Sequence, residues 1–217
     1  TDSWEEIFAA EADGSYLEKY QISDYKPLDL GAEGIINMQI AAFDVDDLAD
    51  GSGKAHVSWI GRETLKTKYY FNVRDFASSG AYEEGFGAIG GWEKSALRSY
   101  LKGSIKTMIP ALVRNQIVDV TKTQNAHNTE GREFTQTTQD DIWIPSDSEV
   151  DGSKSIYCEL FPNAANRIKK GAADETSIMW WLRNTRNTYS VRICMTDGAI
   201  SSGTTSADRG VVLCFCT

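Results

Sequence analysis

The sequence predicts an α+β fold of small twisted antiparallel sheets, two packed helices and a large share of irregular loops. Strand-like segments are concentrated towards the two ends of the chain. Amphipathic helical patterns lie in its first half, and long irregular connections join the two kinds of segment. No repeat is evident, and this distribution is typical of α+β domains rather than of alternating α/β folds.

Composition and length predict a globular protein with a sizeable core and argue against membrane insertion and nucleic-acid binding. The 217 residues include 41% hydrophobic residues and six Trp, enough for a sizeable core. No apolar run approaches the roughly 20 residues of a membrane helix, and residues 1–13 lack a signal-peptide pattern. The net charge of −9 argues against a nucleic-acid backbone or an anionic lipid as main partner. We expect no nucleic-acid binding and no membrane insertion.

An N-terminal helix precedes the main body. Ser3 and Glu6 have the spacing of a capping box, and Gly14 is a C-terminal stop signal. An apolar, partly aromatic stripe on this helix predicts that it docks on the rest of the chain. We therefore expect residues 1–34 to form a helix and an extended segment, packed on a domain formed by residues 35–217.

Three segments of the main body are expected to form strands. Residues 35–43 and 55–62 predict an antiparallel pair joined by residues 44–53. This acidic connection lacks the ligand spacing of an EF-hand, so it predicts a solvated hairpin loop and no metal site. Residues 211–216 are apolar on both faces, which predicts a central strand covered on both sides.

Two amphipathic helices are expected to cover the sheet. One runs from about Trp92 to Leu101 and is expected to end at Gly103, and the other spans about residues 110–118. Residues 120–138 are polar and predict an excursion outside the core. Residues 151–173 predict an irregular segment, anchored by apolar side chains at Phe161 and Ile168.

No constellation of residues predicts an enzyme, and we expect no cofactor. The four Cys residues include no C-x-x-C pair, which favours small buried thiols over a zinc site. His56 and His127 lie in no motif and are expected to be solvated loop residues. No G-x-S-x-G sequence is present, so a nucleophile with a positioned base is not indicated.

Towards the C-terminus, strand-like segments alternate with polar runs. Residues 179–183 and 210–216 are strand-like, whereas residues 184–190 and 201–209 are almost wholly polar. Such residues are typical of binding loops, because Tyr supplies rigid contact area and Ser, Thr and Asn supply adaptable hydrogen bonds. Ordinary solvated hairpin loops have the same composition, so the residues alone leave both interpretations open.

A resemblance to a known family favours binding. Residues 180–183 (Trp-Trp-Leu-Arg) and 210–213 (Gly-Val-Val-Leu) resemble the C-terminal half of a C-type lectin-like fold, in the version of formylglycine-generating enzymes and of the variable proteins of diversity-generating retroelements. Residues 90–93 (Gly-Gly-Trp-Glu) and 142–146 (Ile-Trp-Ile-Pro-Ser) also resemble a related family common in gut bacteria and their phages. The resemblance covers roughly residue 35 to the end.

The resemblance implies a fixed scaffold that displays diversified side chains on one ligand-binding face. The implied scaffold residues are Trp180, Trp181, Leu182, Arg183, Gly210, Val211, Leu213 and Phe215. The implied variable residues, which template adenines would randomise, are Asn184, Thr185, Arg186, Asn187, Tyr189, Arg192, Thr196, Asp197, Ile200, Ser202, Thr204, Asp208 and Arg209.

The same resemblance implies the partners and the setting. We expect a protein or glycan on a target cell surface as ligand, a possible homo-oligomer, and a phage virion or bacterial cell surface as location. The alternatives are an oxidoreductase like the formylglycine-generating enzymes, which would use a cysteine or copper site, and a virion structural module of fixed sequence.

Overall fold

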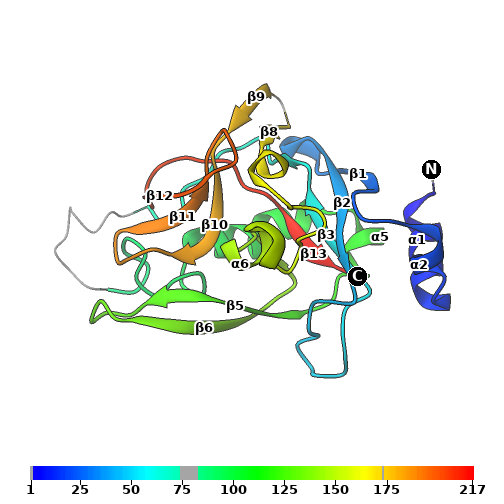
Figure 1. Cartoon of the computed structure of the whole chain (residues 1–217), viewed down its shortest axis with the longest axis horizontal. Helices are drawn as coiled ribbons and strands as arrows, with labels where there is room; N and C mark the ends of the chain where they lie inside the picture. Colours follow the sequence, from blue (N-terminus) through cyan, green and yellow to red (C-terminus); the bar gives the residue numbers. More distant parts are fainter. Residues whose placement is uncertain (1, 74–82, 173) are drawn as a thin grey trace.

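The computed structural model describes residues 2–73, 83–172 and 174–217, and it confirms a mixed α+β fold with several small antiparallel sheets (Figure 1). The largest sheet has five strands in the order β1-β2-β3-β13-β7, all antiparallel. These strands are Tyr25–Asp29, Ile35–Phe43, Val57–Gly61, Cys214–Cys216 and Ile142–Trp143 respectively.

The last strand, β13, lies inside this sheet, as predicted from its apolar faces. Phe215 pairs with Trp59 of β3 on one side and with Ile142 of β7 on the other. All three side chains are at most 2% exposed. The predicted pairing of β2 with β3 is also confirmed, with a register shift between Ile40 and Ala42.

Three smaller sheets complete the β structure. A three-stranded sheet joins β10, β11 and β12 (Trp180–Thr185, Ser190–Cys194 and Ile200–Thr204). A second joins β4, β8 and β9 (Glu63–Thr64, Lys169–Gly171 and Asp174–Ile178), in which β4 and β8 are parallel. The third is the hairpin of β5 and β6 (Val120–His127 and Glu133–Asp140).

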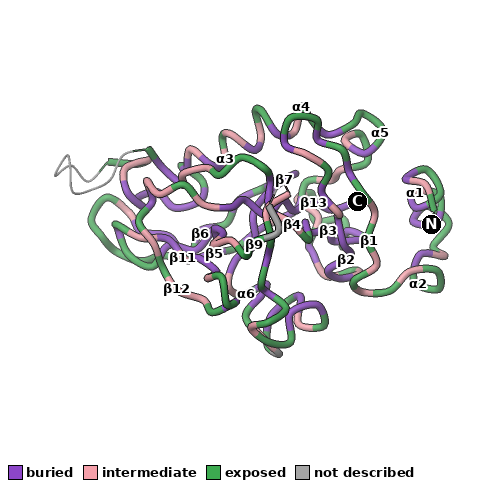
Figure 2. Tube along the Cα trace, turned by 90° about the horizontal axis from the view of Figure 1, so that it is seen from above, coloured by how far each residue is buried: buried purple, intermediate pink, exposed green. Residues whose placement is uncertain are grey.

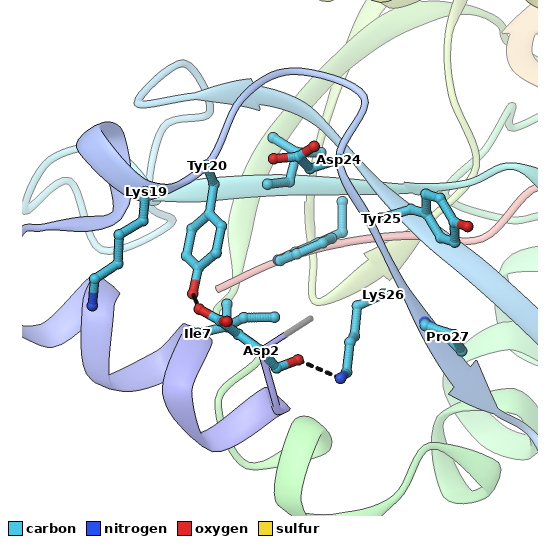
Figure 3. Close-up of a pocket in the computed structure, with 10 residues that line it drawn as sticks. Asp2, Ile7, Lys19, Tyr20, Asp24, Tyr25, Lys26 and Pro27 are labelled. Carbon is cyan, nitrogen blue, oxygen red and sulfur yellow. Dashed lines mark hydrogen bonds between the residues drawn. The ribbon is translucent and has the colours of Figure 1, made fainter.

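The N-terminal helices α1 (Trp4–Asp13) and α2 (Tyr16–Lys19) lie at one end of the molecule (Figure 1). The Ser3 capping box and the left-handed Gly14 cap are both present, as predicted. Trp4 packs edge-on against Trp59, with 5.1 Å between ring centroids. Beside this contact a groove of about 670 Å³ runs along β1 (Figure 3). Asp2 crosses it, accepting a hydrogen bond from the Tyr20 hydroxyl and, through its carbonyl, another from Lys26.

The helical layer differs from the prediction. Helix α3 (Ala96–Tyr100) continues through a π-helical turn (Leu101–Ile105) into α4 (Lys106–Met108), so Gly103 does not end it. Leu101 and Ile105 are fully buried, and their packing outweighs the roughly 1 kcal/mol propensity cost of a glycine. The second helix, α5, is shorter than expected and spans Ala111–Arg114. Figure 2 shows α3, α4 and α5 along one side of the molecule.

The prediction of a polar excursion at residues 120–138 is wrong. This segment forms the β5–β6 hairpin, whose alternate side chains, including Lys122 and Gln124, are buried. Those side chains are polar, so the alternation is not visible as a hydrophobic pattern. Phe161 is buried as expected, whereas Ile168 is 39% exposed and does not anchor its segment.

Short helical turns occupy several of the connections between strands. Helix α6 (Asp147–Val150) begins where a second capping pattern predicted a helical turn, and the Ser146 amide donates to the Glu149 carboxylate (2.8 Å). The 3₁₀ turns span Gly31–Glu33, Gly152–Lys154 and Ala164–Arg167. Among the described residues, no helix has the length and apolar character needed to cross a membrane.

Glu11 on α1 predicts a stability that depends on pH. Burial raises its pKa from 4.5 to about 7, although the Thr217 hydroxyl donates to it (3.0 Å) and lowers the pKa. The folded state therefore holds a proton that the unfolded state releases, and stability falls as pH rises from about 4.5 through 7. We expect Glu11→Gln to raise the free energy of unfolding at pH 8 by roughly 2–3 kcal/mol, and to change it little at pH 4.

Urea denaturation followed by Trp fluorescence at the two pH values measures this difference. Glu5→Gln, an exposed position on the same helix, is the matched control and should show no gain at pH 8. Equal effects of Glu11→Gln at both pH values would contradict the assignment.

Candidate functional site

Strand β10 forms the foundation of the candidate site. All six of its residues, Trp180–Thr185, are buried, and it pairs with β11 across a register shift between Trp181 and Thr185. The Trp180 and Trp181 indoles donate to the carbonyls of Arg167 and Tyr69 (3.0 and 2.8 Å). The indole rings are buried and their N–H groups are hydrogen-bonded, so the two Trp side chains hold this strand in one position.

The two motifs that carry the resemblance meet in space. The Trp181 amide donates to the Gly210 carbonyl (3.1 Å), and the Gly210 amide donates to the Met179 carbonyl (2.9 Å). A side chain at Gly210 would lie 2.6 Å from the Thr64 methyl carbon, so glycine is required for this close approach. The proposed scaffold residues are all buried, namely Trp180, Trp181, Leu182, Arg183, Gly210, Val211, Leu213 and Phe215.

Strands β11 and β12 present one outward face, which we call the hairpin face and define by Arg192, Ile200, Ser202 and Thr204. Arg192 pairs with Ser202, and Thr204 pairs with Ser190, so these side chains point to the same side of the sheet. Ser202 and Thr204 are exposed, and Arg192 and Ile200 are partly exposed. The inward side chains of β11, Val191 and Ile193, are at most 2% exposed.

The turn between β10 and β11 lies at one end of this face and adds Arg186 and Tyr189, both exposed. Asn187 organises the turn: its Oδ1 accepts from the amides of Tyr189 and Ser190 and from the Ser190 hydroxyl, each at 2.9 Å. A single carboxamide thus closes the loop, a role for which Asn is favoured in turns. Asn187 is therefore a structural residue as well as an exposed one.

Replacing Asn187 with Ala should loosen the turn. Three hydrogen bonds lose their acceptor, and we expect the free energy of unfolding to fall by about 1–2 kcal/mol. Asn187→Asp keeps an acceptor oxygen and is expected to lose less than half as much. Chemical denaturation measures both changes, and hydrogen exchange of the Tyr189 and Ser190 amides locates them. Unchanged exchange at these amides in Asn187→Ala would contradict this role.

Two proposed binding residues lie in the interior rather than on the surface. Asn184 Oδ1 accepts from the Asp147 amide (3.1 Å), and the Thr185 hydroxyl contacts His127 Nδ1 (2.7 Å) and the Asn125 carbonyl (3.3 Å). His127 is 6% exposed, so its prediction as a solvated residue is wrong. Burial lowers the pKa of His127.

The other proposed residues lie at separate places. Thr196 and Asp197 lie in the turn at the other end of β11. The two ends of a five-residue strand are roughly 13 Å apart. Asp208 is exposed, whereas the Arg209 guanidinium packs over the Trp181 ring (5.4 Å) and against the Met179 sulfur (2.9 Å). Burial lowers the pKa of Arg209. The structure thus places Arg186 and Tyr189 at one end of the hairpin face and the turn of Thr196 and Asp197 at the other, and it packs Arg209 against Trp181.

Beneath the site is a buried ionic network that the sequence did not reveal. Glu149 accepts two hydrogen bonds from Arg183 (2.6 and 2.9 Å) and one from Lys122 (3.0 Å). Lys122 also donates to Asp46 (2.5 Å), which accepts from the Tyr157 hydroxyl (2.8 Å). Asp46 is 5% exposed, which corrects the expectation that its whole loop is solvated.

The charges of this network balance. Burial alone would raise the pKa of Glu149, but Arg183 and Lys122 lower it to about 2. Burial alone would lower the pKa of Lys122, but Glu149 and Asp46 raise it. Two cations therefore face two carboxylates with their hydrogen bonds largely satisfied. The arrangement stabilises one packing of β5, α6 and β10.

Two of the four cysteines lie in surroundings that disfavour the thiolate form. Cys214 and Cys216 are fully buried, and burial raises the pKa of both thiols well above the usual value. Their surroundings therefore disfavour the thiolate form that nucleophilic or metal chemistry needs. Within the described part of the chain, no group of three or more His, Cys, Asp and Glu side chains could hold a metal ion.

Comparison with known proteins identifies one family. A protein-family model described as a domain of unknown function (DUF6273) matches residues 57–216, from β3 to the end of β13. No curated protein and no solved structure matches the chain. The matched segment contains the hairpin face, the β10 foundation and the buried network except Asp46, and well over half of the chain lies within it.

Proposed function

The chain belongs to the DUF6273 family, and we propose that it is a ligand-binding protein whose hairpin face contacts a protein or glycan on a target cell surface. The observation that carries the proposal is the pairing of Arg192 with Ser202 and of Ser190 with Thr204, which gathers a cation and several hydroxyls on one outward face. Arg and Tyr are the residues most often responsible for binding energy at interfaces.

The strands that carry the hairpin face favour a binding mode that needs no conformational closure around the ligand. Strand β11 pairs with β10, and Trp180, Trp181 and Ile193 are buried, so the backbone that carries the surface side chains is held in place. Arg192 lies 3.6 Å from Asp147, a partly exposed ion pair that orients the guanidinium. A pre-organised face loses less conformational entropy on association, so exposed side chains can change while the backbone stays constant.

We further propose that the scaffold is C-type lectin-like and that the face is diversified by a retroelement. The contact between the Trp-Trp-Leu-Arg strand and Gly210 supports this, since it joins both motifs of the resemblance. The residues suited to variation are the exposed or partly exposed ones at the face, Arg186, Tyr189, Arg192, Ser202 and Thr204. Asn184, Thr185 and Asn187 are less suited because their side chains support the backbone. A phage virion or a bacterial cell surface is the proposed setting.

The test is DNA sequencing around the gene in independent isolates. We expect a near-copy of the segment encoding residues 184–209, a reverse-transcriptase gene beside it, and differences confined to codons where the copy has adenine. Substitutions should concentrate at Arg192, Ser202 and Thr204 and spare Trp180 and Trp181. A missing template together with identical residues 184–209 in all isolates would exclude diversification and favour a fixed-sequence virion module. The oxidoreductase alternative requires exposed cysteines, and burial of Cys214 and Cys216 disfavours it.

A further inference from the structure

A second surface, formed by other residues than the hairpin face, contains a polar groove of about 590 Å³. It lies between the outward side of β2 and the β4–β8 pair, and we call it the β2–β8 groove. Its lining includes the amide side chains of Asn37, Gln39 and Asn166. The volume lies within the range of small-molecule sites, which is about 300–1,000 Å³.

The residues that line this groove are mainly basic, whereas the protein as a whole is acidic. The whole chain has 31 acidic and 22 basic residues, yet the groove is lined by Arg62, Lys169 and Lys170 and by one carboxylate, Glu63. Both oxygens of Glu63 accept hydrogen bonds from Asn37, one from its backbone amide (2.9 Å) and one from its side chain (3.0 Å). Both oxygens of the Glu63 carboxylate are thus already hydrogen-bonded to neutral N–H groups of Asn37.

Arg62 is exposed, and contacts with Tyr25 and Asn37 hold it in position. Its guanidinium lies 4.6 Å from the centroid of the Tyr25 ring, and its backbone amide donates to the Asn37 carbonyl (2.9 Å). Among the described residues, no carboxylate lies within 4 Å of the guanidinium nitrogens. A planar guanidinium held on an aromatic face keeps its fork of N–H donors available for an oxyanion.

Lys169 adds a cation beneath the groove. Its side chain is 3% exposed, and its Nζ donates to the Gly61 carbonyl (2.6 Å) rather than to a carboxylate. Burial lowers the pKa of Lys169 to about 8, with Arg62 acting in the same direction and Glu63 opposing it. The ammonium form therefore still predominates at pH 7 and leaves positive charge under the groove.

We propose that the β2–β8 groove binds a hydroxylated ligand that carries a carboxylate or phosphate, such as a sugar acid or a sugar phosphate. Arg62 would hold the oxyanion, and the amides of Asn37, Gln39 and Asn166 would hydrogen-bond the hydroxyls. This site is independent of the hairpin face, so each proposal can fail without the other.

Isothermal titration calorimetry of the full chain tests this with glucuronate, glucose 6-phosphate, glucose and inorganic phosphate. We expect glucuronate or glucose 6-phosphate to bind at least tenfold more tightly than glucose and than inorganic phosphate. The tighter of the two identifies the charged group. Arg62→Ala should weaken that binding at least tenfold. Arg132→Ala, which removes an exposed Arg on the β5–β6 turn, is the matched control and should leave it unchanged.

Four results would overturn the proposal: binding of neither charged sugar, equal binding of glucose, equal binding of inorganic phosphate, and full binding by Arg62→Ala. Because Arg62 is exposed and makes no side-chain hydrogen bond among the described residues, its replacement should leave the fold intact. A far-ultraviolet circular dichroism spectrum of the variant checks this. Arg192→Ala on the hairpin face should not affect sugar binding, which separates the two sites.

Discussion

Replacing Glu149 with Gln is expected to destabilise the protein by about 3–5 kcal/mol, because two buried cations would lose their shared counter-charge. Glu149 and Arg183 are at most 1% exposed, and Lys122 is 2% exposed, so water cannot replace the lost carboxylate. Gln keeps the shape and one acceptor oxygen, so the loss measures charge rather than packing. Urea denaturation followed by Trp fluorescence gives the change in free energy of unfolding.

The exposed pair of Arg132 and Glu130 is the matched control. These side chains are 80% and 62% exposed and lie 3.2 Å apart, so Glu130→Gln should cost no more than about 0.5 kcal/mol. A loss below about 1 kcal/mol in Glu149→Gln would contradict the view that its charge is required. The paired variant Glu149→Gln with Arg183→Met should recover part of the loss, because it removes the cation that pairs with Glu149 and leaves the Lys122–Asp46 pair in place.

The same carboxylate predicts an acid-dependent loss of stability. Its pKa in the folded state is about 2, below the ordinary value of 4.5, so its contribution is complete above pH 4.5 and is lost as the pH falls towards 2. Glu149→Gln should lack this part of the acid dependence. Comparing the slopes of stability against pH in the two proteins separates it from the titration of other carboxylates.

Local signals predicted much of the fold correctly. The caps at Ser3 and Gly14 depend on neighbouring residues, and the apolar faces of β13 are visible within a single segment. The helix at Gly103 was predicted to end because a glycine is a local stop signal, but contacts of Leu101 and Ile105 with the distant core decided the outcome.

The buried network was missed because nothing local distinguishes it. Asp46, Lys122, Glu149 and Arg183 come from four separate segments, and each is a charged residue that solvent would ordinarily surround. Their burial follows only once β5, α6 and β10 are packed together. Burial alternates along residues 120–127, but several inward side chains are as polar as the outward ones, so this alternation left no pattern in the sequence.

The candidate site was predicted by composition more than by geometry. Polar composition correctly marked Arg186, Tyr189 and Ser202 as exposed. It also included Asn184 and Thr185, because a residue that satisfies buried backbone groups has the same polar chemistry as one that meets a ligand. Only the three-dimensional contacts separate these two roles.

Replacing Gly198 with Ala should destabilise the protein by about 3 kcal/mol, combining backbone strain with a steric clash. Gly198 has a φ of +83°, and a Cβ there would lie 1.8 Å from the Ala164 carbonyl oxygen. Gly14→Ala is the matched control, since Gly14 has a φ of +80° and no atom within 4 Å of such a Cβ. It should cost about 1 kcal/mol from strain alone, so the difference between the variants measures the clash.

The clash should also reach the hairpin face. The Gly198 carbonyl accepts from Arg167 (2.8 Å), and the Arg167 carbonyl accepts from the Trp180 indole (3.0 Å). Moving the turn therefore disturbs the contact that positions β10, and chemical shifts at Arg192 and Ser202 should change in Gly198→Ala but not in Gly14→Ala. Shifts confined to residues 164 and 195–199 would show that β10 holds the face without help from this turn.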